Sequence, residues 1–356
     1  MSAVAIVGAG FMGSAMAWPL ADRGHEVRLV GTHLDEEIIA SCKSSGWHPK
    51  LKRRLPGGVS PFSIAELERG LDGVDLIVQG VSSAGVAWAA ETLGPRLDGR
   101  IPLLAITKGL AHDPGGSLQI LPDHFDSLLP ARARGRVPLA AVGGPCIAGE
   151  LAGRRQTCVV FAGRDAALLE RLAGMLRTDY YHIWTSTDLA GVEACAALKN
   201  AYVLGIGLAT GMLEAVGGPD EAGACMFNLA AALFAEAAWE MARLVGLLGG
   251  DPALVPGLPG VGDMFVTAQG GRTLTIGALL GRGLGIEEAL HELAGVTLES
   301  VDAIRVVNRA LPRMEQDGRL REDELPLMRY LGEIVAGRAG RIPLEAFFGG
   351  QRSSEA

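Results

Sequence analysis

The 356-residue sequence predicts an α/β fold in which a doubly wound, mostly parallel sheet precedes an all-α C-terminal domain. Three observations support this prediction. Up to residue 187, short apolar runs alternate with helix-like segments, as in a parallel sheet covered by helices. From residue 188 onward the segments are long and rich in Ala and Leu. At roughly 100–200 residues per domain, the length is also that of two domains.

The N-terminal domain, residues 1–187, is predicted from its strands. Continuous apolar runs fit strands that are buried on both faces of a sheet. The first run is Ser2–Val7, and a predicted helix over Ser14–Arg23 follows it. The other predicted strands are Glu26–Val30, Val74–Val81, Ile101–Ile106, Val137–Val142, Thr157–Phe161 and Tyr181–Thr185.

The C-terminal domain, residues 188–350, is predicted from two long helices. Leu189–Leu213 and Ala222–Leu248 are apolar over most of their circumference, so we expect them at the buried centre of this domain. Gly and Pro mark breaks at Gly217–Pro219 and Gly249–Pro259. The polar tail, residues 351–356, is expected to be disordered.

Composition narrows the classes of function. The chain has 32 Lys and Arg against 40 Asp and Glu, a net charge of −8, and so lacks the basic surface that nucleic acids require. Its longest nearly charge-free runs, Ala201–Leu213 and Ala222–Ala235, are shorter than the roughly 18–20 residues of a membrane span. Five widely spaced cysteines without a CxxC pair indicate reduced thiols, so we expect a cytoplasmic protein without a metal site.

A glycine-rich signature follows the first predicted strand. The segment GAGFMG has the spacing GxGxxG and stands between that strand and the first helix. Gly8 permits the tight turn, Gly10 lets a pyrophosphate approach the backbone, and Gly13 lets the helix lie close to the strand. Phe11 and Met12, between these glycines and just before the predicted helix, are expected cofactor contacts. The sequence therefore predicts a Rossmann-type dinucleotide-binding domain.

The turn after the second strand bears on the choice between NAD and NADP. An acidic residue there would bind the 2′-hydroxyl of NAD and repel a 2′-phosphate. The sequence instead has Thr32 and His33, with Arg28 nearby, and its first carboxylate is Asp35. Thr32 and His33 can donate to a phosphate, which favours NADP, with NAD as the alternative. His33 can equally be a solvated loop histidine.

Two further strand ends supply candidate residues. Lys108 directly follows the fourth predicted strand, and ligands of open α/β sheets gather at the carboxyl ends of strands. Gly143 and Gly144 follow the next strand and precede a helix near Ala148, which suits close backbone contact with a cofactor. By itself Lys108 could be a solvated loop lysine, and Pro145 fits an ordinary helix start.

The helical domain contains an isolated lysine and a polar cluster. Lys199 lies among Ala, Leu and Val, so its amine must either reach solvent or be partly buried with a lowered pKa. A lysine of the second kind can serve as a general acid and base. Asp263 and Thr267 are four residues apart and would share a helix face. Arg272 follows in a glycine-rich stretch, either to bind phosphate oxygens or as a surface arginine.

Taken in order, these segments resemble the NAD(P)-dependent glycerol-3-phosphate dehydrogenase family. The resemblance covers nearly the whole chain and rests on five motifs, which are GAGFMGSA, TKG, GGPCIAGE, GVEACAALKN and GVGDMFVTAQGGR. The opening segment, the VGT turn and the pair His48 and Pro49 look most like the archaeal-type branch. The resemblance implies reduction of dihydroxyacetone phosphate to sn-glycerol 3-phosphate by hydride transfer from NADPH or NADH.

The resemblance also implies a role for each candidate residue. Lys199 would donate the proton to the substrate oxygen, Asp263 would pair with Lys199, and Thr267 would lie alongside. Lys108 would contact both the substrate and the cofactor. The other implied contacts are Arg272 with the substrate phosphate and the cofactor, Asn200 and Thr273 with the substrate, and Ala148 and Glu299 with the cofactor.

Two departures from the family pattern leave the substrate open. Thr273 stands where the family has Asn after the arginine, and Leu-Glu-Ser surrounds Glu299 where Glu-Gly is typical. A threonine hydroxyl is shorter than an amide and lacks its two donors. A dehydrogenase of another small phosphorylated or anionic polyol or hydroxy acid is therefore the alternative, and a non-catalytic dinucleotide sensor is a further one. The long apolar helices could be buried within the chain or in a homodimer.

Overall fold

The computed structural model describes residues 1–294, 298–338 and 347. The chain divides into two compact units, residues 1–108 with 119–193 and residues 109–118 with 194–356, which we call the sheet unit and the helical unit. The division falls within one helix, α9 (Leu189–Ala215), after Glu193. The predicted tail, residues 351–356, lies outside the described residues.

The sheet unit is built on an eight-stranded sheet of order β12-β11-β10-β7-β6-β1-β2-β5. Neighbouring strands are parallel except for β10 and β11. The predicted α/β class with a mostly parallel sheet is thereby confirmed. The strands of the sheet are β1 (Ala3–Val7), β2 (Glu26–Val30), β5 (Val59–Phe62), β6 (Leu76–Gln79), β7 (Leu103–Ala105), β10 (Leu139–Gly143), β11 (Thr157–Gly163) and β12 (Tyr181–Ser186).

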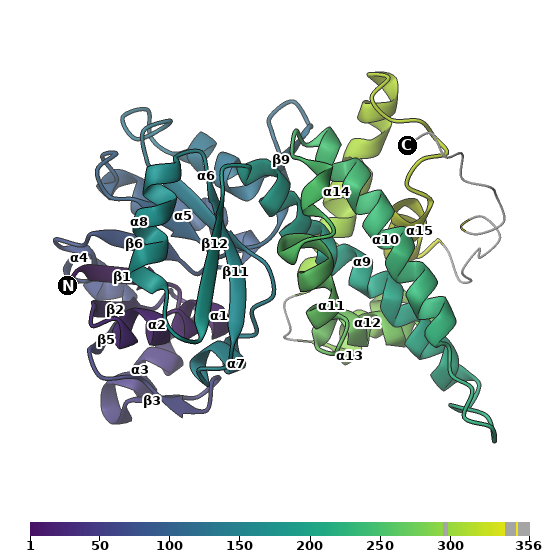
Figure 1. Cartoon of the computed structure of the whole chain (residues 1–356), viewed down its shortest axis with the longest axis horizontal. Helices are drawn as coiled ribbons and strands as arrows, with labels where there is room; N and C mark the ends of the chain where they lie inside the picture. The colour runs from purple at the N-terminus through teal and green to yellow at the C-terminus, as the bar shows by residue number, and fades with distance from the viewer. Residues whose placement is uncertain (295–297, 339–346, 348–356) are drawn as a thin grey trace. The chain divides into compact units, whose positions relative to one another are not determined.

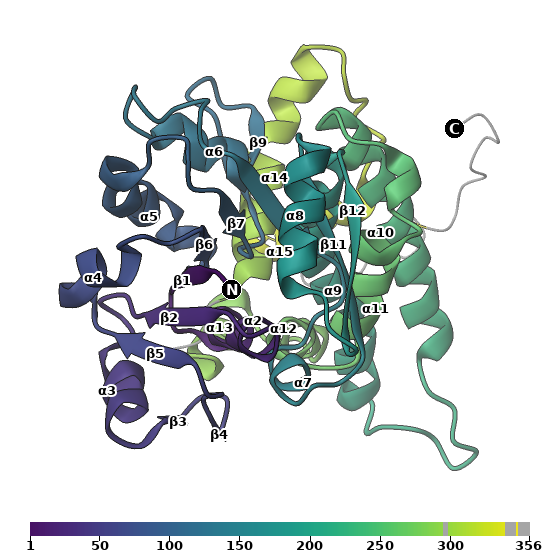
Figure 2. The same ribbon diagram turned by 60° about the vertical axis from the view of Figure 1, so that its left-hand side comes forward.

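Helices cover both faces of this sheet (Figures 1 and 2). The sheet needs cover on both faces because its side chains are apolar on both, as alternate residues of β1 show. Val4 and Ile6 pack in one cluster with Met16, Leu20 and Leu172, while the residues between them are equally buried outside it. The helices are α1 (Phe11–Ala15), α2 (Ala17–Asp22), α3 (Glu36–Ser45), α4 (Leu67–Leu71), α5 (Val86–Leu93), α6 (Leu121–Leu128), α7 (Ala148–Ala152) and α8 (Ala166–Leu176). Short strands outside the large sheet are β3 (Trp47–His48), β4 (Arg53–Arg54), β8 (Leu110–His112) and β9 (Leu118–Ile120).

Two local features differ from the sequence prediction. Strand β5 is not among the predicted strands, because it is short and contains Pro61; it lies at the edge of the sheet, where a missing N–H is tolerated. The single helix predicted over Ser14–Arg23 begins earlier, at Phe11, and is interrupted at Met16. Pro19 accounts for the interruption, since it cannot donate to the carbonyl four residues before it.

The helical unit is organised around α9. This helix is long and apolar enough to cross a membrane by length and composition, but 94% of its apolar stretch is buried within the structure, as in a core helix. The second long helix begins later than predicted, at Phe227 instead of Ala222. The other helices are α10 (Phe227–Leu247), α11 (Asp263–Thr267), α12 (Arg272–Gly281), α13 (Ile286–Glu292), α14 (Glu299–Gln316) and α15 (Pro326–Val335), with a π-helical turn, η5, over Leu258–Gly262.

Glycines let α9 and α12 pack unusually closely. A Cβ atom added at Gly211 would lie 1.9 Å from the carbonyl oxygen of Ala278, and one added at Gly207 would lie 2.6 Å from that of Leu274. On α12, a Cβ at Gly281 would lie 2.3 Å from the carbonyl oxygen of Leu208. No side chain fits between these backbones, so the glycines set the distance between the two helices.

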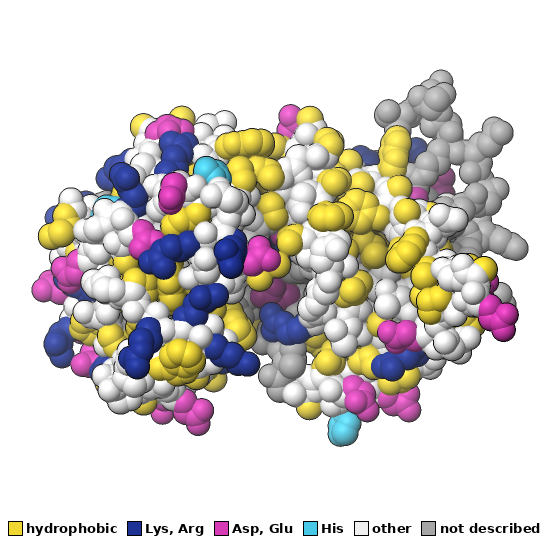
Figure 3. Space-filling model, turned by 60° about the horizontal axis from the view of Figure 1, so that its bottom comes forward, with side chains coloured by type: hydrophobic (Ala, Val, Ile, Leu, Met, Phe, Trp, Pro, Cys, Tyr) yellow, Lys and Arg dark blue, Asp and Glu magenta, His cyan; other side chains and the backbone are white. Residues whose placement is uncertain are grey.

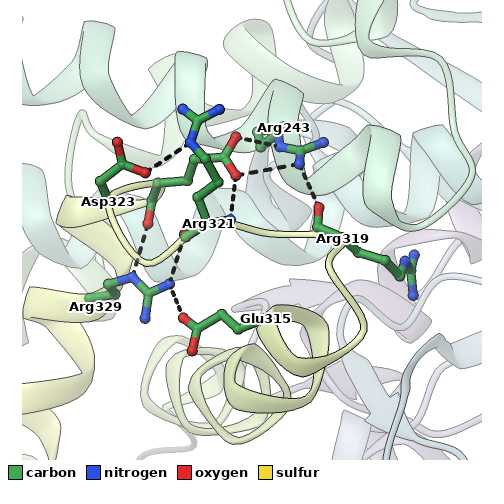
Figure 4. Close-up of polar contacts among 7 residues, drawn as sticks. Arg243, Glu315, Arg319, Arg321, Asp323 and Arg329 are labelled. Atoms are coloured by element: carbon green, nitrogen blue, oxygen red, sulfur yellow. Dashed lines mark hydrogen bonds and ion pairs between the residues drawn. The ribbon is translucent and has the colours of Figure 1, made fainter.

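Polar contacts tie α10, α14 and α15 together (Figure 4). Glu324 accepts from Arg243 of α10 at 2.9 Å, and Arg329 of α15 pairs with Glu315 of α14. Deeper in the unit, the carboxylate of Glu240 accepts from the backbone N–H groups that begin α15. Those bonds measure 2.6 Å from Leu327 and 2.9 Å from Met328, and the hydroxyl of Tyr202 donates to the same carboxylate at 3.0 Å.

Charged side chains of both signs intermingle on the face of the sheet unit drawn in Figure 3. Ion pairs also form among the charged side chains of the sheet unit. Arg154 and Asp22 pair at 2.7 Å, and Arg164 and Asp123 pair at 2.9 Å. Part of the charge of this unit is therefore locally balanced.

Candidate active site

The glycine-rich turn after β1 has the geometry of a dinucleotide-binding loop. Gly8 has a φ of +111°, and a Cβ there would lie 2.6 Å from the carbonyl oxygen of Gly80. A Cβ on Gly13 would lie 2.2 Å from the carbonyl oxygen of Gly8, so α1 lies close to the turn. A Cβ on Gly10 would meet nothing within 4 Å. The turn is thus packed inside and open at Gly10, where α1 begins at Phe11, and this arrangement fits a pyrophosphate.

A buried carboxylate connects this turn to the end of β2. Asp35 accepts from the backbone N–H of Ala9 at 3.1 Å, from the N–H of Thr32 at 2.9 Å and from the Thr32 hydroxyl at 2.8 Å. In the sequence, Asp35 is only the first carboxylate after the strand, and Thr32 is predicted to donate to a phosphate. In the structure, the hydroxyl proton of Thr32 is already directed at Asp35.

His33 and Arg28 occupy different environments near the same strand end. His33 is exposed and makes an edge contact with the ring of Trp88, with 5.6 Å between ring centroids. Its imidazole is therefore accessible to a ligand. Arg28 donates to Glu26 at 2.8 Å and to the carbonyl oxygens of Arg69 and Asp72. Of these two candidates, only His33 is left facing solvent.

His48 contacts both the glycine-rich turn and the helix α1 that follows it. The ring is buried, and Nδ1 accepts from the N–H of Leu51 at 3.0 Å, so Nε2 carries the proton. Nε2 lies 2.8 Å from the Ser14 hydroxyl and 3.2 Å from the carbonyl oxygen of Ala9. Burial lowers the pKa of His48 from its ordinary value, which keeps the ring neutral and these contacts intact.

Lys108 lies beside the second glycine-rich strand end, as predicted. It is half-buried, and its Nζ donates to the carbonyl oxygen of Gly144 at 3.2 Å. The hydroxyl of the preceding residue, Thr107, donates to the carbonyl oxygen of Val81 at 2.6 Å. These bonds join the turns that follow β6, β7 and β10 at one edge of the sheet. Ala148 begins α7 a short distance beyond Gly144.

In the helical unit, Lys199 is buried and held by two side chains. Its exposed fraction is 7%, so the amine does not reach out to solvent. Nζ donates to Asp263 at 2.5 Å and to the Thr267 hydroxyl at 2.8 Å. The Thr267 hydroxyl in turn donates to the carbonyl oxygen of Asp263 at 2.7 Å. The structure thus brings together the lysine, the carboxylate and the hydroxyl that the sequence singled out separately.

The π-helical turn η5 explains the position of Asp263. The turn ends at Gly262, and Asp263 is the first residue of α11 with only 1% exposure. A Cβ on Gly260 would lie 2.2 Å from the carbonyl oxygen of Val255, so the backbone folds tightly here. One turn of α11 then separates Asp263 from Thr267, and both face Lys199.

The remaining candidates of the helical unit are Asn200, within α9, and three residues at helix starts. Asn200 donates to Glu299, the first residue of α14, at 3.3 Å. Arg272 is the exposed first residue of α12 rather than a loop residue, and Thr273 follows it in the first turn. Gly271 caps this helix with a φ of +89°. An arginine and free N–H groups at one helix start are suited to an anion.

Sequence reasoning missed several buried titratable groups, and Glu193 is one of them. It lies in α9 with none of its surface exposed, and within the described residues neither carboxyl oxygen has a hydrogen-bond partner. A signal existed, because Glu193 is a lone acid in the same apolar stretch that contains Lys199. Among the described residues, no group of His, Cys, Asp and Glu is arranged to hold a metal ion.

The class of protein that this fold and these residues define is the dinucleotide-dependent dehydrogenases. Comparison with known proteins identifies the family. Residues 3–169 match the N-terminal part, and residues 188–341 the C-terminal part, of NAD-dependent glycerol-3-phosphate dehydrogenase. The chain belongs to this family, and the resemblance based on its motifs is confirmed.

Individual relatives agree with this family. The chain is 35% identical over 307 residues to an NADP(+)-dependent glycerol-3-phosphate dehydrogenase of Archaeoglobus fulgidus, covering 86% of this chain and 88% of the relative. It is 30% identical over 339 residues to an NAD(P)+ glycerol-3-phosphate dehydrogenase of Bacillus cereus, covering 94% and 92%. The solved glycerol-3-phosphate dehydrogenase of Coxiella burnetii matches with a TM-score of 0.80 at 26% identity over 97% of both chains.

Proposed function

We propose that the protein interconverts dihydroxyacetone phosphate and sn-glycerol 3-phosphate with NADPH or NADH. The observation that carries this proposal is the buried Lys199, held by Asp263 and Thr267. A lysine fixed in this way can give a proton to a substrate oxygen and take it back in the reverse direction. When bound, the reduced nicotinamide supplies the hydride that reaches the carbonyl carbon.

The other candidate residues have supporting roles in this proposal. Asp263 and Thr267 hold Lys199 Nζ in one direction, so little reorganisation is needed when the substrate oxygen becomes negative. Lys108 contacts the substrate, and its positive charge stabilises the developing oxyanion. Arg272 binds the substrate phosphate with its guanidinium, and Thr273 adds its hydroxyl. Asn200 contacts the substrate as well, and Glu299 lies on the cofactor side.

The proposed cofactor contacts are those of the sheet unit. Gly8, Gly10 and Gly13 shape the turn for the pyrophosphate, with Phe11 and Met12 at the start of α1 and Ala148 at the start of α7. His33 is the candidate for the 2′-phosphate of NADP, since Thr32 donates to Asp35. Residues 1–187 then serve the dinucleotide, and residues 188–350 serve the substrate. NADP is the preferred cofactor in this proposal, and NAD the alternative.

A spectrophotometric assay tests the proposed reaction. Dihydroxyacetone phosphate should cause oxidation of NADPH or NADH by the wild-type protein, and Lys199→Ala should abolish turnover with nearly unchanged cofactor affinity. Turnover of Lys199→Ala at the wild-type rate would overturn the role of Lys199. If other ketones but not dihydroxyacetone phosphate support oxidation, the substrate is another small anionic polyol or hydroxy acid. Cofactor binding without any turnover would indicate a dinucleotide sensor.

The cellular setting is also a proposal. The cysteine pattern supports a cytoplasmic protein, because widely spaced cysteines without a CxxC pair suit a reducing compartment.

The oligomeric state is a second proposal. Phe227 and Trp239 of α10 remain 77% and 55% exposed, which supports a homodimer that covers them. Sedimentation velocity would show the mass of a single chain if this second proposal is wrong.

A further inference from the structure

The carbonyl group of Ala9, in the glycine-rich turn, is held by a buried histidine. The imidazole Nε2 of His48 carries the proton and lies 3.2 Å from the carbonyl oxygen of Ala9 and 2.8 Å from the Ser14 hydroxyl. Neither His48 nor Ser14 has any exposed surface. Bulk water therefore does not compete for the Nε2 proton, which is shared between two acceptors of the turn and its helix.

Two anchors keep His48 in this position. Its Nδ1 accepts from the N–H of Leu51 at 3.0 Å, and Leu51 is itself buried in the hydrophobic cluster that contains Val4 and Ile6. The backbone of His48 is paired with Arg53 in the two-stranded β3–β4 ladder. The imidazole is thus fixed relative to the core of the sheet unit, and so is the carbonyl oxygen that it contacts.

The other side of Ala9 is held by Asp35. The carboxylate of Asp35 accepts from the N–H of Ala9 at 3.1 Å, and this side chain is buried as well. Both peptide groups that flank the Cα of Ala9 are therefore fixed by buried side chains, one from the end of β2 and one from β3. A rotation of the backbone at Ala9 would break one of these two bonds.

The fixed carbonyl group determines the direction of the next N–H. The peptide between Ala9 and Gly10 is trans, and in a planar trans peptide the carbonyl and the N–H point in opposite directions. Because the carbonyl oxygen faces His48, the N–H of Gly10 faces away from it. Gly10 immediately precedes α1, so this N–H is not used within the helix. A Cβ on Gly10 would meet nothing among the described residues within 4 Å, so the backbone is open there.

We propose that His48 is a positioning residue for the dinucleotide, which turns the peptide between Ala9 and Gly10 so that the Gly10 N–H is directed at the pyrophosphate. This inference rests on the cofactor contacts of the proposed function. The bond from Nε2 also polarises the amide, which makes the Gly10 N–H a better donor to an anion. His48 itself touches neither cofactor nor substrate and keeps its proton throughout.

A fluorescence titration of the reduced cofactor tests this role without any turnover. The cofactor is NADPH or NADH, whichever the wild type binds more tightly. His48→Leu keeps the size of the side chain but cannot donate, so the dissociation constant should rise about 10-fold, as expected for one lost hydrogen bond. His48→Gln, whose amide can donate to Ala9, should stay within about threefold of the wild type. His124→Leu removes a partly buried histidine of α6 and, as the matched control, should leave the constant unchanged.

Urea denaturation separates positioning from a purely structural role. A structural role alone would lower the urea midpoint of His48→Leu and leave the dissociation constant of the folded protein unchanged, and this result overturns the inference. Binding by His48→Gln as weak as that by His48→Leu overturns it too. If His48→Leu does not fold, NMR of the wild type decides. The Gly10 amide proton should move downfield when the cofactor is added, and an unmoved resonance overturns the inference.

The outcome for the proposed reaction is distinguishable, because these titrations contain no substrate. A wild type that is inactive with dihydroxyacetone phosphate overturns the reaction, while weaker cofactor binding by His48→Leu still supports the positioning role. A wild type that turns over, together with an unchanged dissociation constant in His48→Leu, keeps the reaction and overturns the positioning role. A wild type that binds neither cofactor overturns both.

Discussion

The glycine contact between α9 and α12 makes a sharp prediction about both stability and activity. We consider Gly211→Ala, which adds one methyl group where the added carbon would lie 1.9 Å from the carbonyl oxygen of Ala278. Carbon and oxygen atoms in ordinary contact are about 3.3 Å apart. The two helices would therefore have to separate by about 1.4 Å, because the obstacle is backbone and cannot rotate away.

The magnitude follows from this displacement. Overpacking of a close contact costs about 1–3 kcal/mol in the free energy of unfolding. Arg272 begins α12, whereas Lys199 belongs to α9, so the proposed phosphate-binding residue would move relative to the proposed proton donor. A misplacement of about 1 Å lowers the rate by about 100-fold. We expect kcat/KM of Gly211→Ala to fall by about that factor.

Urea denaturation and the reduced-cofactor assay measure the two effects together. Gly174→Ala is the matched control, because Gly174 lies in α8 and a Cβ there would meet nothing within 4 Å. The control should gain about 0.4–1 kcal/mol and keep full activity. If Gly211→Ala were as stable and as active as Gly174→Ala, the close packing would not position α12, and the reasoning would be wrong.

Two further predictions concern buried carboxylates. Asp35→Ala leaves the N–H groups of Ala9 and Thr32 without their acceptor, at about 1–3 kcal/mol each, so the dissociation constant for NADPH should rise at least about 10-fold in a fluorescence titration. An unchanged constant would show that the glycine-rich turn does not need Asp35. Burial raises the pKa of Glu240 to about 7, so the native state binds this proton more tightly than the unfolded state. As the pH rises from about 5 to about 7, the urea midpoint of the wild type should therefore decrease. The midpoint of Glu240→Gln should not show this decrease. If the midpoints of both proteins changed equally with pH, the prediction would be wrong.

Much of the fold is predictable because local and global preferences agree in this chain. The apolar strands of the sheet are buried on both faces, so each appears in the sequence as a continuous apolar run. Strand β5 escapes prediction because Pro61 argues against a strand, and only the position at the sheet edge makes it acceptable. The early start of α1 escapes prediction because its first turn belongs to the glycine-rich segment, where close packing at Gly8 and Gly13 rather than helix propensity decides the residues.

The site is predictable where its residues are chemically unusual for their surroundings. Lys199 in an apolar helix and Asp263 after a run of glycines both stand out in the sequence alone. The hydrogen bond from the Thr32 hydroxyl to Asp35 is not predictable, since the conformation of the turn decides whether the hydroxyl faces Asp35 or a ligand. Glu193 gives only a weak signal in the sequence, because a single acid in a helix is usually solvated, and its complete burial is visible only in the structure.

The segment 109–118 belongs to the helical unit although the chain on either side of it belongs to the sheet unit. His112 donates to the carbonyl oxygen of Val306 at 2.9 Å, across 194 residues, and Arg313 donates to that of Gly115. On the ribosome, at about 5–20 residues per second, His112 is made roughly 10–40 s before its partner exists. The sheet unit must therefore complete its early strands around a loop whose partner has not yet been synthesised, and the enzyme becomes whole only when α14 leaves the exit tunnel.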